Sequence, residues 1–349
     1  MSGPKPARIR PESIPVTLLT GFLGAGKTTL LNRILARRKA GDIALVINEF
    51  GLVPVDHDLV VAGREQATVT TAGCICCTAG SDIRSSLDEL LHLRRSGAPA
   101  FSHVVVETTG LADSAPIINS LIPGGAPAVA LRDHATARAF HLANVVTVVD
   151  VGRIGVIARQ FPEAFRQIAF ADRVVLAHSE GEDTTQASLA MKLINPSLAI
   201  EGSAAPDFDP AALLAAGSYS GLGKGEDILR WLEAEEGHSH SHRLDDLNRH
   251  GAVKAIPLVR EAPIEEAALR GFLLRLVGTP DNGLLRVKGL VAVPGRAGPA
   301  VVHAVGHNLH PTRFLERWPE GAASTRLVVI VTALDEAALR REFDALPGA

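Results

Sequence analysis

The stretch GFLGAGKT, residues 21–28, constrains the fold of this chain more than any other feature. It follows the apolar run VTLLT and precedes TTLLNRIL, which has the apolar spacing of a helix. A G-x-x-x-x-G-K-[ST] loop between a strand and a helix is typical of a P-loop, whose backbone N–H groups surround phosphate oxygens. The sequence therefore predicts a phosphate-binding site within an α/β domain, rather than a glycine turn that fits the pattern by chance.

The residues of this loop have different expected roles. Lys27 should reach the β- and γ-phosphates of a nucleotide, and the Thr28 hydroxyl should bind Mg²⁺. We expect nucleotide contacts from the whole loop, namely Gly21, Gly24, Ala25, Gly26, Lys27, Thr28 and Thr29.

A carboxylate is expected beside the loop, because the apolar run HVVVE ends at Glu107 and is followed by TTG. In P-loop proteins, an acid at the end of a neighbouring parallel strand holds the Mg²⁺ shell or polarises water. Gly110 has no side chain, so its N–H can approach a terminal phosphate. We expect Lys27, Glu107 and Gly110 to be catalytic.

Short apolar runs alternate with amphipathic segments through the first half of the chain. The expected strands lack polar alternation, as do strands buried on both faces of a parallel sheet; they are 16–20, 43–48, 68–71, 103–107, 145–150 and 173–177. Expected helices include 28–38, 81–95 and 114–121. This alternation predicts a mostly parallel, doubly wound α/β sheet of the P-loop NTPase class.

The pattern changes after about residue 205. A polar segment around HSHSH reads as a linker, and consecutive strand-like runs follow it, which favours antiparallel pairing. The runs are strands at 252–259, 284–293, 300–306 and 326–332, with helices at 264–277 and 335–346. We therefore expect a flexible tail (1–13), a P-loop domain (14–228), a His-rich linker (229–250) and a smaller α+β domain with an antiparallel sheet (251–349).

All three cysteines lie within VTTAGCICCTAG, residues 69–80. Thiolates favour Zn²⁺ and similar metals over Mg²⁺, so Cys74, Cys76 and Cys77 predict a site with three sulfur ligands. A carboxylate, histidine, water or partner ligand could take the fourth position. Buried free cysteines and a redox switch are the alternatives, but clustering in one loop favours the metal.

Histidines form two further sets. His238, His240 and His242 alternate in the expected linker, where imidazole could capture metal for handover; chance histidines in a solvated linker are the alternative. The second set lies near expected strand ends, namely His303, His307 and His310. For these, structural or partner-surface roles are favoured over metal binding.

Composition narrows the remaining functions. The net charge of −3 gives no positive field for nucleic acid or a membrane surface. No apolar run reaches the roughly 20 residues that span a bilayer, and the N-terminus lacks the apolar core of a signal peptide. We expect a cytoplasmic protein and leave homo-oligomerisation open.

Several of these motifs together resemble the CobW-type P-loop GTPases: GFLGAGKTTLLN, NEFG, GCICC, ETTGLAD and QIAFADRVVL, with LLRVKGLVAVPGR in the second domain. The likeness runs over nearly the whole chain. The family contains proposed metallochaperones, including zinc-transfer proteins, cobalamin-biosynthesis proteins and nitrile hydratase activators. The resemblance implies GTP hydrolysis coupled to binding and delivery of a metal to a client metalloprotein. The C-x-C-C ligands themselves admit Zn²⁺ first, with Co²⁺ and Ni²⁺ behind it. By the same resemblance, Cys74, Cys76 and Cys77 are the metal-site thiols and Glu107 is the characteristic strand-end glutamate.

The base-reading loop departs from the family pattern, which is usually N-K-x-D after a strand such as RVVL. This chain has Ala177, His178, Ser179 and Glu180 there. Glu180 keeps the carboxylate but adds a methylene, and Ala177 has no amide. Each lost partner of a buried polar group costs roughly 1–3 kcal/mol, so we predict weaker selection of guanine.

A second departure affects the metal site, because Leu52 follows NEFG where an acid is usual. Glu49, Asp56 and Asp58 remain as carboxylate candidates, with Glu49 the candidate zinc ligand.

The leading hypothesis is a metal-delivering GTPase with slow intrinsic turnover, whose client docks against the second domain. Bound Mg–nucleotide should order residues 48–58 and 107–113, between which the cysteine loop lies in sequence. Three alternatives remain: a zinc buffer or sensor in which nucleotide only stabilises the fold, a cobalt chaperone for cobalamin biosynthesis, and a small-molecule kinase. The kinase leaves the thiols without a role.

Overall fold

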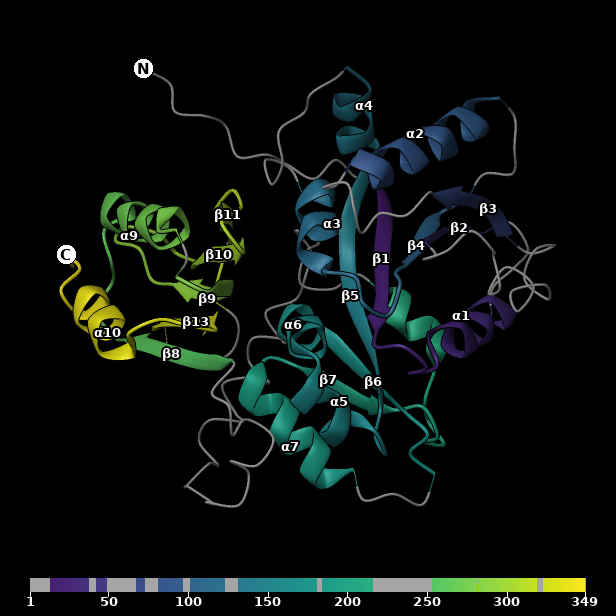
Figure 1. Cartoon of the computed structure of the whole chain (residues 1–349). Coiled ribbons are helices and arrows are strands. Elements are labelled where there is room, and N and C mark those ends of the chain that lie inside the picture. The colour runs from purple at the N-terminus through teal and green to yellow at the C-terminus, as the bar shows by residue number, and fades with distance from the viewer. Residues whose placement is uncertain are drawn as a thin grey trace. The chain divides into compact units, whose positions relative to one another are not determined.

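The computed structural model describes residues 13–37, 42–48, 67–72, 81–96, 101–122, 131–180, 184–215, 253–280, 282–318 and 323–348. Contacts between residues divide the chain into two compact units (Figure 1). The first unit holds the described residues up to 187 and those from 199 to 215. The second holds residues 188–198 and the described residues from 253 onward.

The first unit is built on a seven-stranded sheet with the order β3-β2-β4-β1-β5-β6-β7 (Figure 1). Its strands are β1 (Ile14–Gly21), β2 (Ile43–Asn48), β3 (Ala67–Ala72), β4 (His103–Glu107), β5 (Phe140–Asp150), β6 (Arg173–Ala177) and β7 (Ala199–Gly202). All of their pairings are parallel, as the near-continuous apolar runs predict. The expected doubly wound α/β class is therefore confirmed.

Helices cover both faces of this sheet (Figure 1). They are α1 (Lys27–Ala36), α2 (Ser81–Arg95), α3 (Ser114–Leu121), α4 (Leu131–Ala139), α5 (Ile154–Gln160) and α6 (Pro162–Phe170), with a 3₁₀ turn at η3 (Pro210–Leu214). Helix α7 (Thr185–Ile194) begins in this unit and continues into residues 188–198 of the second. Leu31 and Ile34 of α1 share a buried cluster with Val105 and Val146 on one face. Helices α3 and α6 contact β1 and β5 but contribute no described residue to that cluster, so they lie on the other face.

Local signals set where these helices begin. Helix α1 starts after Gly26, whose φ of 93° is a left-handed conformation that side chains rarely adopt. Helix α3 starts after Asp113, whose Oδ1 accepts a hydrogen bond from Ala115 N at 3.0 Å. Both helices thus begin a few residues beyond the carboxyl ends of β1 and β4, and the intervening loops lie at one edge of the sheet.

The second unit contains an antiparallel sheet with the order β11-β10-β9-β13-β8, and β12 pairs with β10. Its elements are β8 (Lys254–Arg260), α9 (Glu266–Gly278), β9 (Leu284–Val291), β10 (Ala300–Val305), β11 (Asn308–Leu309), β12 (Arg313–Phe314), β13 (Thr325–Val331) and α10 (Glu336–Asp344). Val287 and Val329 of the sheet share a core with Phe272 of α9 and Phe343 of α10, whose rings lie 5.8 Å apart. The expected α+β fold of this region is confirmed.

Among the described helices, none combines the length and the apolarity needed to cross a membrane.

Candidate nucleotide site

The loop after β1 occupies the edge of the sheet where ligands bind in open α/β folds. Strand β1 lies between β4 and β5, and all three run parallel. In such sheets, ligands bind outside the carboxyl ends of the strands, at the point where the strand order reverses. Residues 21–28 therefore lie at the position that a phosphate-binding loop requires.

The geometry of this loop suits an anion. Gly21, Gly24 and Gly26 all have positive φ, at 143°, 72° and 93°. Lys27 Nζ donates hydrogen bonds to Gly21 O at 2.9 Å and to Phe22 O at 3.2 Å. These bonds hold the ammonium against the loop, so its charge adds to that of the N–H groups at the start of α1.

Thr28 and Glu107 come together from different strands. Thr28 Oγ1 donates a hydrogen bond to Glu107 Oε1 at 3.0 Å, and Glu107 is only 6% exposed. The register of β1 and β4 aligns Leu19 with Glu107, which fixes the carboxylate beside the loop. A hydroxyl and a carboxylate oxygen are the hard ligands that Mg²⁺ prefers, so these two residues fit a magnesium ion.

The loop after β4 packs directly on the loop after β1. A Cβ added to Gly110 would meet the backbone of Leu23, with Leu23 Cα only 2.7 Å away. Thr108 N donates to Leu19 O, and Thr108 Oγ1 donates to Thr20 Oγ1, each at 3.0 Å. Lys27, Glu107 and Gly110, which were expected to be catalytic, therefore lie around one edge of the sheet. At position 110 no residue with a side chain would fit.

The base-reading segment follows β6 and lies beside the same loop. Ala177 is 9% exposed, and a Cβ added to Gly26 would lie 3.5 Å from its Cβ. His178 has a φ of 53°, and its Nδ1 lies 3.2 Å from Asp150 Oδ2. Glu180 is exposed. The segment is thus linked to the end of β5 through an imidazole–carboxylate contact, at a place where the family pattern carries Asn and Lys.

Two residues beside this site were not identified from the sequence. A Cβ added to Gly24 would lie 3.1 Å from Arg153 Nη1, so a guanidinium lies next to the phosphate-binding loop. Gln167 of α6 is 1% exposed and contacts the loop after β4. An amide within the otherwise buried face of AFRQIAF was the signal that could have revealed Gln167.

Most of the predicted metal ligands lie outside the described residues: Glu49, Asp56, Asp58, Cys74, Cys76, Cys77, His238, His240 and His242. The strand order still shows where their segments begin. Glu49 directly follows β2, and the cysteine segment follows β3, next to β2 in the sheet. Because the strands are parallel, both segments leave the sheet at the edge that holds Glu107. Within the described parts of the chain, no three His, Cys, Asp or Glu side chains gather closely enough to hold a metal ion.

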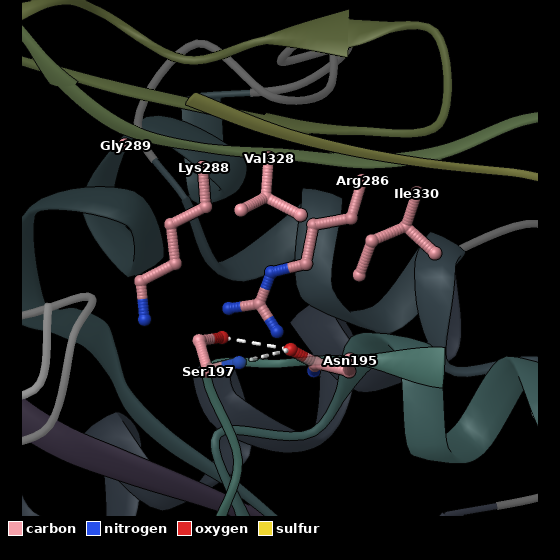
Figure 2. Close-up of a pocket in the computed structure, with 7 residues that line it drawn as sticks. All are labelled: Asn195, Ser197, Arg286, Lys288, Gly289, Val328 and Ile330. Atoms are coloured by element: carbon pink, nitrogen blue, oxygen red, sulfur yellow. Dashed lines mark hydrogen bonds between the residues drawn. The ribbon is translucent and has the colours of Figure 1, made fainter. Parts of the chain in front are cut away.

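The second unit has a cavity, lined by residues outside the nucleotide motifs, into which two basic side chains extend (Figure 2). Figure 2 shows the side chains of Arg286 and Lys288 extending from β9 into it. Ser197 donates to Asn195 Oδ1 from both N and Oγ, at 3.2 and 2.7 Å. The described lining residues are Asn195, Ser197, Arg286, Lys288, Gly289, Val328 and Ile330. Arg286, Lys288 and Gly289 belong to the stretch LLRVKGLVAVPGR, to which the sequence assigned no binding role.

Two histidines of this unit are buried close together. His303 lies within β10, two residues before its end at Val305, and pairs with Lys288 of β9. Its ring centroid is 4.8 Å from that of His310. Burial lowers the pKa of His303 well below its usual value, and burial together with Arg286 lowers the pKa of His310 to about 3. Both rings are therefore neutral at pH 7, which favours a structural role.

His307 differs from this pair, because its Nδ1 contacts Val277 O at 2.8 Å, at the end of α9.

Comparison with known families accounts for both parts of the chain. Residues 15–198 match the family described as CobW/HypB/UreG, nucleotide-binding domain. Residues 253–346 match the family described as Cobalamin synthesis protein cobW C-terminal domain.

Individual relatives match over almost their full length. The chain is 32% identical to "Zinc chaperone CobW" of Sinorhizobium sp, over 97% of this chain and 99% of that protein. It is 27% identical to "Zinc chaperone YjiA" of Escherichia coli, over 95% and 98%. The crystal structure of Zn(II)-bound YjiA GTPase from E. coli shares the fold, with a TM-score of 0.72 at 24% identity over 96% of this chain and 99% of the other. The family matches and the length of these similarities establish that the chain belongs to the CobW family.

Proposed function

We propose that this protein is a GTP-hydrolysing metallochaperone that binds Zn²⁺ through Cys74, Cys76 and Cys77 and delivers it to a client metalloprotein under nucleotide control. The observation that carries the proposal is the hydrogen bond of Thr28 to Glu107 beside Lys27. These three side chains are the types that bind Mg²⁺ and nucleotide phosphates in P-loop proteins. They occur in a chain whose relatives, named as zinc chaperones, match both of its domains.

The chemistry follows from the residues around the loop. Backbone N–H groups of residues 21–28 and the Lys27 ammonium bind the phosphates and balance their charge. Thr28 and Glu107 hold Mg²⁺, which when bound neutralises charge that develops on the transferred phosphoryl group. The loop that contains Gly110 packs on the P-loop at Leu23, and its Gly110 N–H would donate to a terminal phosphate oxygen. These groups position and stabilise charge, which is most of what phosphoryl transfer requires of a protein.

Strand order supports a link between nucleotide and zinc. From the end of β1, the successive neighbours are β4 with Glu107, β2 leading to Glu49, and β3 leading to the cysteines. Neighbouring strands lie about 4.8 Å apart, so the three segments begin within roughly 15 Å of the phosphate-binding loop. A terminal phosphate that reorganises the loop at Glu107–Asp113 can thus act on the zinc ligands through one intervening segment. Coupling of this kind is reciprocal: nucleotide changes zinc affinity by the factor by which zinc changes nucleotide affinity.

The test is a zinc titration of the full-length protein with GDP and with a non-hydrolysable GTP analogue, each with Mg²⁺. We expect zinc affinities that differ by roughly 5- to 150-fold between the two nucleotides, the usual range of coupling energies. Cys76→Ser should abolish tight zinc binding. In zinc-free buffer it should leave nucleotide affinity within about threefold, since neither Lys27 nor Thr28 is altered. Equal zinc affinity in the two nucleotide states would instead support a zinc buffer.

The same titration addresses the cobalt alternative. Three thiolates favour Zn²⁺, whereas a cobalt chaperone should retain Co²⁺ in competition with Zn²⁺ at physiological ratios. Docking of the client against the C-terminal domain remains a prediction, which cross-linking of the loaded protein to a purified client would test.

A further inference from the structure

Helix α6 contacts both loops that face the phosphates. Phe22 of the P-loop is buried with Ala164 of α6, and its ring lies 4.7 Å from that of Phe161, just before the helix. Three residues beyond Ala164, Gln167 contacts the loop after β4. One short helix therefore lies against the two segments that a nucleotide would bridge.

The Gln167 amide fixes the backbone of the loop at Gly110. Its Nε2 donates to Gly110 O at 3.0 Å and to Ala112 O at 3.4 Å. Leu111, between these two carbonyls, is 43% exposed. Because a buried amide cannot exchange these bonds for bonds to water without cost, the loop is strongly held in the conformation that places Gly110 against Leu23.

The position of Gln167 is itself fixed from the central sheet. The backbone carbonyl of Gln167 accepts a hydrogen bond from Thr147 Oγ1 at 3.0 Å, and Thr147 of β5 pairs with Thr20 near the end of β1. Thr20 Oγ1 in turn accepts from Thr108 and Ser114, at the two ends of the loop. The loop after β4 is thus attached to β1 at both ends and to α6 in the middle.

We propose that Gln167 is a positioning residue for GTP hydrolysis, which orients the Gly110 N–H toward the terminal phosphate by holding the Gly110 and Ala112 carbonyls. The inference rests on the proposed GTPase function and deepens it. Because the phosphate that Gly110 would bind is the terminal one, which a diphosphate lacks, the Gln167 amide should contribute to binding of the triphosphate and to turnover but not to binding of the diphosphate. Release of the two carbonyls is also the step by which the loop would leave the phosphate after hydrolysis.

The experiment compares two variants. Gln167→Met keeps the length of the side chain and removes its N–H donor. Gln167→Glu keeps the shape of the side chain and places a carboxylate against the carbonyls of Gly110 and Ala112. Gln186→Met and Gln186→Glu, on the exposed face of α7, are matched controls. We expect both Gln167 variants to lose at least about tenfold in affinity for a non-hydrolysable GTP analogue and in kcat, with GDP affinity unchanged within about threefold. A merely structural residue would weaken both nucleotides by the same factor and lower Tm, and that result, or unchanged triphosphate affinity, would overturn the proposal.

Hydrogen exchange of the wild-type protein gives a second test that needs no variant. Peptides covering residues 107–113 and 162–170 should both become more protected when the GTP analogue replaces GDP. Protection confined to 107–113 would show that α6 does not respond and would overturn the proposal. A wild-type protein that fails to bind or hydrolyse GTP contradicts the proposed function itself, and is thereby distinguished from failure of the Gln167 inference.

Discussion

The double substitution Ala177→Asn with Glu180→Asp should increase the preference of this protein for GTP over ATP. Ala177 lies against Gly26, so an amide at this position would reach the phosphate-binding loop and connect it to the base-reading segment. Aspartate at position 180 is one methylene shorter than glutamate and accepts two hydrogen bonds from the guanine edge. Each restored interaction is worth about 1–3 kcal/mol, or roughly 5- to 150-fold in affinity.

We expect the wild-type ratio of GTP to ATP affinity to be below roughly 150, because two of the usual partners are replaced. The double variant should raise this ratio by at least about tenfold, mainly through tighter GTP binding. The GTP and ATP affinities of the wild-type protein and of the double variant can be measured by competition of each nucleotide against a fluorescent nucleoside diphosphate. Glu261→Asp, the same chemical change at an exposed position of the second unit, should leave the ratio unaltered. A wild-type preference above about a thousandfold would refute this account of the loop.

Three further outcomes follow from the structure. Arg153→Gln should weaken GTP-analogue binding by roughly 3- to 10-fold at low salt, and less at high salt, because an exposed charge beside phosphates is screened; titration at two ionic strengths checks this. Phe343→Ala, which empties a core position, should lower the unfolding free energy by about 3–5 kcal/mol in denaturant titrations. Burial, together with Arg286 and Arg313, lowers the pKa of His310 to about 3, so between pH of about 6.5 and about 3 the unfolded chain gains this proton and the folded chain does not. As the pH falls from about 6.5 to about 3, stability should therefore fall by up to about 1.4 kcal/mol per pH unit, and His310→Gln should reduce that slope.

Much of the fold was predictable because its signals are local. Apolar runs without alternation identified the parallel strands, and the expected ranges 43–48, 103–107 and 173–177 coincide with β2, β4 and β6. The expected strand 145–150 is only the second half of β5, which begins at Phe140. The alanine-rich stretch before it contains no break that marks where helix α4 stops and the strand begins.

The contacts around the site were harder to predict because they join distant parts of the chain. Thr28 and Glu107 could be paired from the sequence, since a known motif predicts which strand ends adjoin. Arg153 belongs to no such motif, and QIAFADRVVL, which begins at Gln167, does not show what Gln167 contacts. The positions of both depend on how α6 packs on β1 and β5 and how α5 packs on α6. His303 illustrates the same limit, because its burial depends on sheet pairing with Lys288 and on the ring of His310.

The departure from the family pattern after β6 is compatible with the residues that we propose to bind phosphate and Mg²⁺, because different strands position the two sets. Lys27, Thr28 and Glu107 depend on β1 and β4, whereas His178 and Glu180 depend on β6 and on Asp150 at the end of β5. A substitution after β6 can therefore alter which base is preferred without moving the Thr28–Glu107 contact. Relaxed base selection should accordingly appear as a smaller difference in KM between GTP and ATP, with kcat values that remain similar. Helix α6 connects the two ends, since Gln167 contacts the phosphate-facing loop and the helix leads directly into β6. A nucleotide whose base binds poorly should then reduce kcat only if it also shifts α6. In the Gln167→Met protein, which lacks the hydrogen bond from α6 to Gly110, kcat should no longer depend on the base.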